Sequence, residues 1–195
     1  LEFRRVLFRS TLLQDTVNRY LTDQVPLDTV RQYAAGELDD KSIWAGLVEL
    51  GIPGLLIPED NGGVGLSSLD AVVVAESLGY HVTPSPFISS AVMAPVALVK
   101  AGGQDDLLSA IAAGEARVGI AFSEAIGARA NAGVQVSNGK VSGKSLFAMD
   151  ADADEYLVAT SEGHLYLVAA EQVSRKPLTT VDVTRTTCEI GRAHV

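Results

Sequence analysis

Residues 104–124, QDDLLSAIAAGEARVGIAFSE, contain the change of periodicity that decides the fold. The first part spaces its apolar residues along one helical face and stops at Gly114. The second part, RVGIAFSE at 117–124, is typical of a strand. The switch at about residue 116 therefore predicts a helical domain followed by a β domain.

Helical patterns fill the chain before this switch. Trp44 lies on an apolar helical face that we interpret as core, and Ser67 and Asp70 have the spacing of a capping box. Glycines at 51, 79, 103 and 114 stand where helices would stop. The predicted helices are 11–21, 27–35, 39–51, 67–79, 89–103 and 104–114.

Strand patterns fill the rest. The segment 133–147 alternates apolar residues around Asn138-Gly139, the strongest short hairpin signal. Two further strands are predicted at 155–160 and 164–170, and a last one near Thr179. We therefore expect an α+β chain. An all-α domain at 11–115 precedes an incomplete antiparallel β-barrel or sandwich at 116–188.

The two ends of the chain have a different predicted origin. One codon choice for Arg5–Ser10, read on the opposite strand with a few flanking nucleotides, encodes Glu189–Val195. That DNA matches a common sequencing-library adapter. We therefore interpret 1–10 and 189–195 as translated adapter and exclude them from fold reasoning. The remainder is then expected to be a fragment of a longer protein.

Composition excludes several classes of function. The net charge of −9 disfavours nucleic acid as a partner. No apolar run is long enough to suggest a membrane span. His81 and His164 are isolated, so no metal site is predicted. The single cysteine, Cys188, fits a reducing cytoplasm, and we expect it to be a buried apolar residue.

The glycine-rich run 57–70, IPEDNGGVGLSSLD, is not a phosphate-binding loop. No Lys-Ser or Lys-Thr pair follows it, and Glu59 and Asp60 would repel a phosphate. We expect a structural role in which the glycines allow positive φ and a tight turn into the next helix. These glycines are Gly62, Gly63 and Gly65.

Several segments in order resemble the acyl-CoA dehydrogenase family. They are Trp44 with ELGIPGLLIPEDNGGVGLSSLD (49–70), Glu76, GEARVGIAFSEA (114–125) and VSGKSLFAMDADADEYLVAT (141–160). The resemblance covers most of 11–188. It implies FAD as cofactor and oxidation of an acyl-CoA thioester to the enoyl-CoA, with hydride passing to flavin N5. It further implies lipid catabolism, an electron-transferring flavoprotein as partner and a homo- or hetero-oligomer.

No catalytic residue is assigned within this chain. In the family, a glutamate of the C-terminal helical domain removes the α-proton, and we expect that domain to lie beyond the sequence given. The fragment alone is therefore expected to be inactive. Glu59, Glu76 and Glu124 are interpreted as cap, turn or surface carboxylates.

The resemblance also assigns contacts to the cofactor. By position they are Ile120, Phe122, Ser123, Phe147 and Met149. Ser123 keeps the hydroxyl of the family's threonine, whereas Met149 stands where the family has Thr or Ser and cannot donate a hydrogen bond.

The family's Gly-Ser-Asp substrate segment reads Gly127-Ala128-Arg129, so its serine is missing. Two interpretations remain open. The parent protein is either a divergent FAD-dependent dehydrogenase or a flavin-poor, non-catalytic partner subunit of a heteromeric one.

Overall fold

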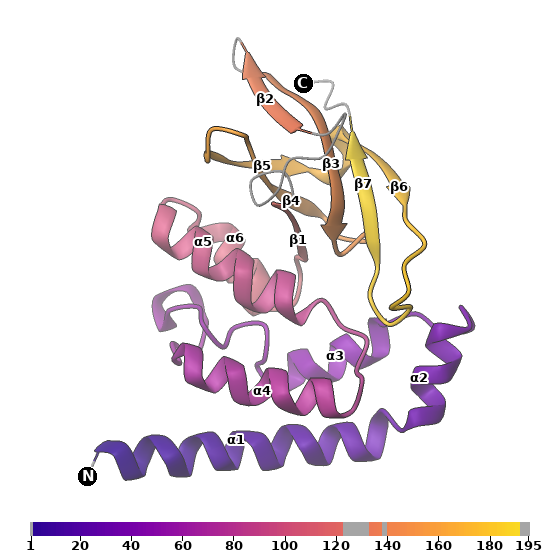
Figure 1. Cartoon of the computed structure of the whole chain (residues 1–195). Coiled ribbons are helices and arrows are strands. Elements are labelled where there is room, and N and C mark those ends of the chain that lie inside the picture. Colours follow the sequence, from indigo (N-terminus) through magenta and orange to yellow (C-terminus); the bar gives the residue numbers. More distant parts are fainter. Residues whose placement is uncertain (1, 123–132, 138–139, 192–195) are drawn as a thin grey trace. The chain divides into compact units, whose positions relative to one another are not determined.

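The structure, a computed structural model, describes residues 2–122, 133–137 and 140–191, with side chains from residue 9 onward. The chain forms two compact units, Leu1–Glu115 and Ala116–Val195. The first is helical and the second is a β sheet, so the predicted fold class is confirmed (Figure 1). Residues 2–10, which include Arg9 and Ser10, lie in the first helix and 189–191 in the last strand, and we predict both parts of the chain to be adapter-encoded.

Helices close to the predicted ranges build the first unit. One departure is at Phe87–Met93, where a π-helix (η2) replaces the expected start of an α-helix. Pro95 follows and has no amide to bond back to Ala91, which disfavours regular α-helix at this junction. The elements are α1 (Glu2–Gln24), α2 (Leu27–Ala34), α3 (Lys41–Glu49), η1 (Glu59–Asn61), α4 (Ser68–Tyr80), η2, α5 (Ala94–Ala101) and α6 (Asp105–Ala112).

The core of the helical unit lies between α1, α3 and α4, and α1 runs along α4 (Figure 1). Trp44 on α3 is 5% exposed, which confirms that this helix face belongs to the hydrophobic core. Side chains of this core are Val17, Leu21, Ile43, Trp44, Leu47, Val74, Leu78 and Phe87.

The capping box at the start of α4 is confirmed. The Asp70 carboxylate accepts hydrogen bonds from the Ser67 amide at 3.0 Å and the Ser67 hydroxyl at 2.7 Å. It also accepts one from the Ser10 hydroxyl at 2.9 Å and pairs with the Arg9 guanidinium at 2.8 Å. Asp70 therefore joins α1 to α4 while it caps α4.

The glycine run before α4 has the expected structural role, for two different reasons. Gly62 has φ of 75° and Gly65 has φ of 65°, the left-handed conformation that glycine adopts without strain. Gly63 instead packs so closely on the carbonyl group of Ile57 that a Cβ atom would overlap it. The turn thus needs glycine at each of these positions.

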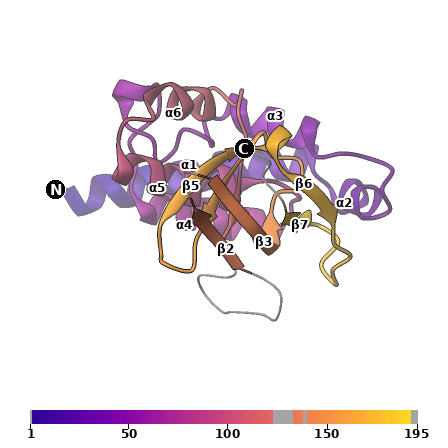
Figure 2. The ribbon, with the colours of Figure 1, turned by 90° about the horizontal axis from the view of Figure 1, so that it is seen from above.

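The described residues of the second unit form a seven-stranded sheet, with strand order β5-β4-β1-β3-β7-β6 and β2 paired to β3. Figure 2 shows β2 beside β3 and β6 beside β7. The strands are β1 (Val118–Ala121), β2 (Gly133–Ser137), β3 (Lys140–Met149), β4 (Glu155–Ala159), β5 (Leu165–Ala169), β6 (Ser174–Pro177) and β7 (Thr187–Gly191).

Two details of the predicted sheet are wrong. The strands are not all antiparallel, because β1 pairs in parallel with β4. The last strand does not begin near Thr179, since 178–186 connects β6 to β7 outside any strand. In that segment the Asp182 carboxylate accepts hydrogen bonds from the Thr184 amide at 2.9 Å and hydroxyl at 2.6 Å. This local turn competes with strand pairing.

The two faces of this sheet differ. Ala121, Ala148, Tyr156 and Cys188 share one buried core with side chains from β2 and β5. Because neighbouring residues of a strand point to opposite faces, the adjacent residues of β1, β3, β4 and β7 lie on the other face. That second face carries the candidate site.

Candidate functional site

The second face of the sheet carries a row of side chains from four neighbouring strands. Ile120 of β1 pairs with Leu157 of β4 on one side and with Met149 of β3 on the other. Met149 in turn pairs with Thr187 of β7. Ile120 and Leu157 are buried, at 2% and 4% exposure. The row is therefore apolar over β4, β1 and β3, and it ends at the hydroxyl-bearing Thr187 of β7.

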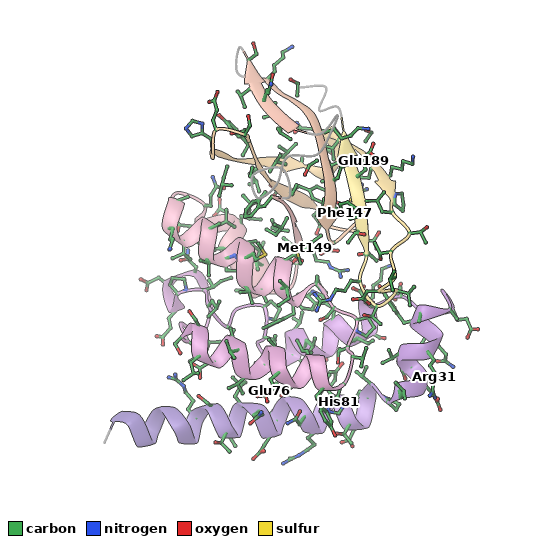
Figure 3. All side chains as sticks on the ribbon, in the orientation of Figure 1. Arg31, Glu76, His81, Phe147, Met149 and Glu189 are labelled. Atoms are coloured by element: carbon green, nitrogen blue, oxygen red, sulfur yellow. The ribbon has the colours of Figure 1, made fainter. Side chains whose placement is uncertain are left out.

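Phe147 lies at an irregularity beside this row. The pairing of β3 with β7 shifts register between Ser145 and Ala148, which marks a β-bulge or similar distortion. Phe147 within it has φ of 55°, a conformation that is costly for an aromatic residue, and the residue is 41% exposed. Figure 3 labels Phe147 and Met149 near the end of β3. Strained backbone at such a place motivates a functional hypothesis.

Polar contacts fix the strand ends that flank the row. Asp150, which follows β3 and has φ of 65°, lies 3.5 Å from the guanidinium of Arg117, which precedes β1. Both side chains are largely buried. The Asp150 amide donates to the Thr186 carbonyl at 3.1 Å, next to the start of β7. The ends of β1, β3 and β7 are thereby held together.

Tyr156 and Cys188 support the row from the opposite face. The buried Tyr156 hydroxyl lies 3.1 Å from the Asp150 carbonyl and 3.0 Å from the Ala151 carbonyl. Burial raises the pKa of Tyr156 well above its ordinary value, so the phenol stays protonated and donates. Burial also raises the pKa of the Cys188 thiol, and Cys188 is fully buried, as expected. These residues are structural rather than reactive.

The structure brings together only part of the predicted cofactor site. Ile120 and Met149 are direct cross-strand neighbours, Phe147 lies beside them on β3, and Phe122 follows β1 half-buried. Ser123, Glu124, Gly127, Ala128 and Arg129 lie outside the described residues.

Sequence reasoning missed Thr187, because the last strand was expected to begin earlier. It also missed the Arg117–Asp150 pair. Arg117 and Asp150 are far apart in the sequence, and no spacing pattern predicts a contact between them. The nearest signal is the position of Asp150, three residues after the predicted strand segment 133–147.

Within the described residues no cluster of His, Cys, Asp and Glu is suited to hold a metal ion. His164 is exposed, and its Nδ1 lies 3.7 Å from a carboxylate oxygen of Glu162. None of the helices that the structure describes is long and apolar enough to cross a membrane.

A helical unit followed by a β sheet is the architecture that the family resemblance in the sequence predicts. Residues 9–115 match the acyl-CoA dehydrogenase N-terminal domain. The chain therefore belongs to the acyl-CoA dehydrogenase family.

Similar proteins of known sequence or structure agree with the family. Acyl-CoA dehydrogenase IpdE2 of Mycobacterium tuberculosis is 30% identical over 176 residues, 89% of this chain and 48% of that protein. IpdE2 of Mycolicibacterium smegmatis is 35% identical over 98 residues, 49% of this chain and 31% of that protein. The chain thus spans about half, or less, of the length of these relatives.

Solved structures share the fold across both units. The Tcur3481-Tcur3483 steroid ACAD G363A variant has a TM-score of 0.82 at 26% identity, covering 95% of this chain and 55% of that one. The ChsE4-ChsE5 complex from Mycobacterium tuberculosis has a TM-score of 0.80 at 23% identity, covering 94% and 54%. An acyl-CoA dehydrogenase complexed with FAD from Bacillus anthracis has a TM-score of 0.70 at 18% identity, covering 94% and 35%.

Proposed function

We propose that the chain is part of an FAD-dependent acyl-CoA dehydrogenase, which oxidises the α,β bond of an acyl-CoA thioester to the enoyl-CoA. When bound, the flavin supplies the hydride acceptor. The β unit would hold the flavin ring against Ile120, Phe147 and Met149. The base, a glutamate in the family, would come from a C-terminal helical domain.

The observation that carries this proposal is the apolar row beside an exposed aromatic ring. Ile120 and Met149 are adjacent across two strands, and Phe147, two residues before Met149 on β3, is 41% exposed and has a strained backbone. The flat face of a flavin ring packs on apolar side chains, whereas its edge is polar. The surface fits a flavin better than it fits a metal or a phosphate, because its described side chains are apolar.

A second candidate function rests on Met149. A thioether cannot donate a hydrogen bond to the flavin. A flavin-poor partner subunit of a heteromeric dehydrogenase would tolerate this change, and two-protein assemblies occur among the solved structures of this fold. Acyl-CoA, an electron-transferring flavoprotein and a second dehydrogenase subunit are the partners we propose, and the cytoplasm is the proposed location.

The test begins with the gene. Sequencing the source DNA outward from codons 11 and 188 recovers the full reading frame for expression. We expect the purified protein to release FAD on denaturation and to reduce a dye in an acyl-CoA-dependent manner. Steroid-type acyl-CoA esters should be included, given the substrate class named for one similar structure. A protein that holds no flavin alone, but activates a co-expressed second dehydrogenase subunit, would favour the second candidate.

A further inference from the structure

Met149 leaves the apolar row without a hydrogen-bond donor at the position where the family has one. The neighbouring strand offers a replacement. Thr187 on β7 is the direct cross-strand partner of Met149 in the antiparallel pair of β3 and β7. Directly paired residues lie on the same sheet face, with Cβ atoms about 5 Å apart. The Thr187 hydroxyl therefore lies on the face that carries Ile120 and Met149.

The Thr187 hydroxyl is buried and has no hydrogen-bond partner among the described residues. The carbonyl of Thr187 is satisfied, since it accepts from the Leu178 amide at 3.0 Å. A threonine hydroxyl can both donate and accept, and leaving it buried without a partner is unfavourable. Valine has the same shape and would avoid this penalty, so the hydroxyl calls for a hydrogen-bond partner that the described residues do not supply.

We propose that the Thr187 hydroxyl donates a hydrogen bond to a polar edge atom of the bound flavin, in place of the donor missing at Met149. This inference rests on the proposed function. It assigns a cofactor-binding role to a β7 residue, which would let a chain with methionine at 149 hold the flavin.

The test uses the full-length protein from the recovered reading frame, in its apo form and loaded with FAD. The variants are Thr187→Val, which removes the hydroxyl, and Thr187→Ser, which keeps it. Met149→Thr is made alone and in the Thr187→Val background. Thr179→Val changes an exposed threonine of the loop between β6 and β7 and serves as the matched control.

We expect Thr187→Val to raise the Kd for FAD about tenfold, the effect of one lost hydrogen bond, and to shift the visible absorption of the bound flavin. Thr187→Ser and Thr179→Val should leave both unchanged. Met149→Thr should restore affinity in the Thr187→Val background and add little alone. In the apo form, Thr187→Val should raise Tm by a few degrees, because an unsatisfied buried hydroxyl is gone.

If Thr187 has this role, Thr187→Val stabilises the apo protein, which raises its Tm, but weakens the binding of FAD. If Thr187→Val raises the apo Tm and leaves FAD affinity and spectrum unchanged, Thr187 is only a buried threonine and the inference is wrong. If wild-type protein takes up no FAD, the proposed function fails and the inference fails with it. If Thr187→Val does not fold, Thr187→Ala replaces it, and Met149→Thr is then compared alone and in the Thr187→Ala background.

Discussion

Replacing Asp70 by alanine should destabilise the helical unit more than its position on one helix suggests. The change removes half of the capping box, worth about 1 kcal/mol. It also removes the hydrogen bond from the buried Ser10 hydroxyl, and bonds to a charged group contribute about 1.5–3 kcal/mol. The half-exposed Arg9 adds less than about 1 kcal/mol. We expect the free energy of unfolding to fall by about 3 kcal/mol.

Urea unfolding of the whole chain, followed by circular dichroism at 222 nm, measures this loss. Asp28→Ala is the matched control. It removes another first-turn carboxylate paired with an arginine, but one on the surface, and should change stability by less than about 0.5 kcal/mol. If Asp70→Ala and Asp28→Ala unfold at the same urea concentration, the contacts of Asp70 do not stabilise the unit and this reasoning fails.

The contribution of Asp70 also depends on pH. Burial pushes the pKa of this carboxyl up, but hydrogen bonds from Ser67 and Ser10 and the charge of Arg9 outweigh it and hold the pKa below its ordinary value. The stabilisation is therefore complete above the unfolded pKa of about 3.9 and is lost as pH falls through the folded pKa. The stability gap between wild type and Asp70→Asn should be constant from about pH 5 to 7 and shrink below about pH 4.

Three further changes test other parts of the fold. Gly63→Ala places a methyl group on a neighbouring carbonyl and should lower the free energy of unfolding in urea by about 1–3 kcal/mol. Tyr156→Phe removes the buried hydroxyl that donates to the carbonyls of Asp150 and Ala151, which keep bonds from the Ala153 amide and from Arg175, and should cost about 1 kcal/mol in the same assay. An unchanged midpoint would contradict the assigned bonds. Cys188, buried with a raised pKa, should react with a thiol reagent far more slowly in native protein than in denaturant.

Local chemistry made the helical unit predictable. The Ser67–Asp70 spacing specifies a cap within one turn, and Gly62 and Gly65 adopt conformations that few other residues tolerate. Trp44 follows from helical spacing alone. In each case neighbouring residues determine the outcome, so the sequence pattern was sufficient.

The site was less predictable because it depends on pairing between distant strands. Ile120 and Met149 were selected through a family resemblance, and only the register makes them neighbours. Thr187 could not be assigned to the site from the sequence, because the strand was expected to begin before the turn at Asp182. Only the observed pairing of β7 with β3 places Thr187 beside Met149. The strain at Phe147 comes from the irregular register of β3 and β7, which no alternation of residues encodes.

The parallel pairing of β1 with β4 has a consequence for the order in which the protein folds during synthesis. Val118 pairs with Glu155, and the other neighbour of β1, at Met149, is only slightly nearer along the chain. When β1 emerges from the ribosome, its partner strands are not yet available for pairing, because that part of the chain has not emerged. The β2–β3 and β4–β5 hairpins form from nearer residues and should close first, leaving β1 to enter between them last. A pause in translation after β1 has emerged, but while β3 and β4 are still inside the ribosome, would therefore expose β1 as an unpaired apolar strand, so the time needed to complete the sheet sets how long the nascent chain is at risk of aggregation.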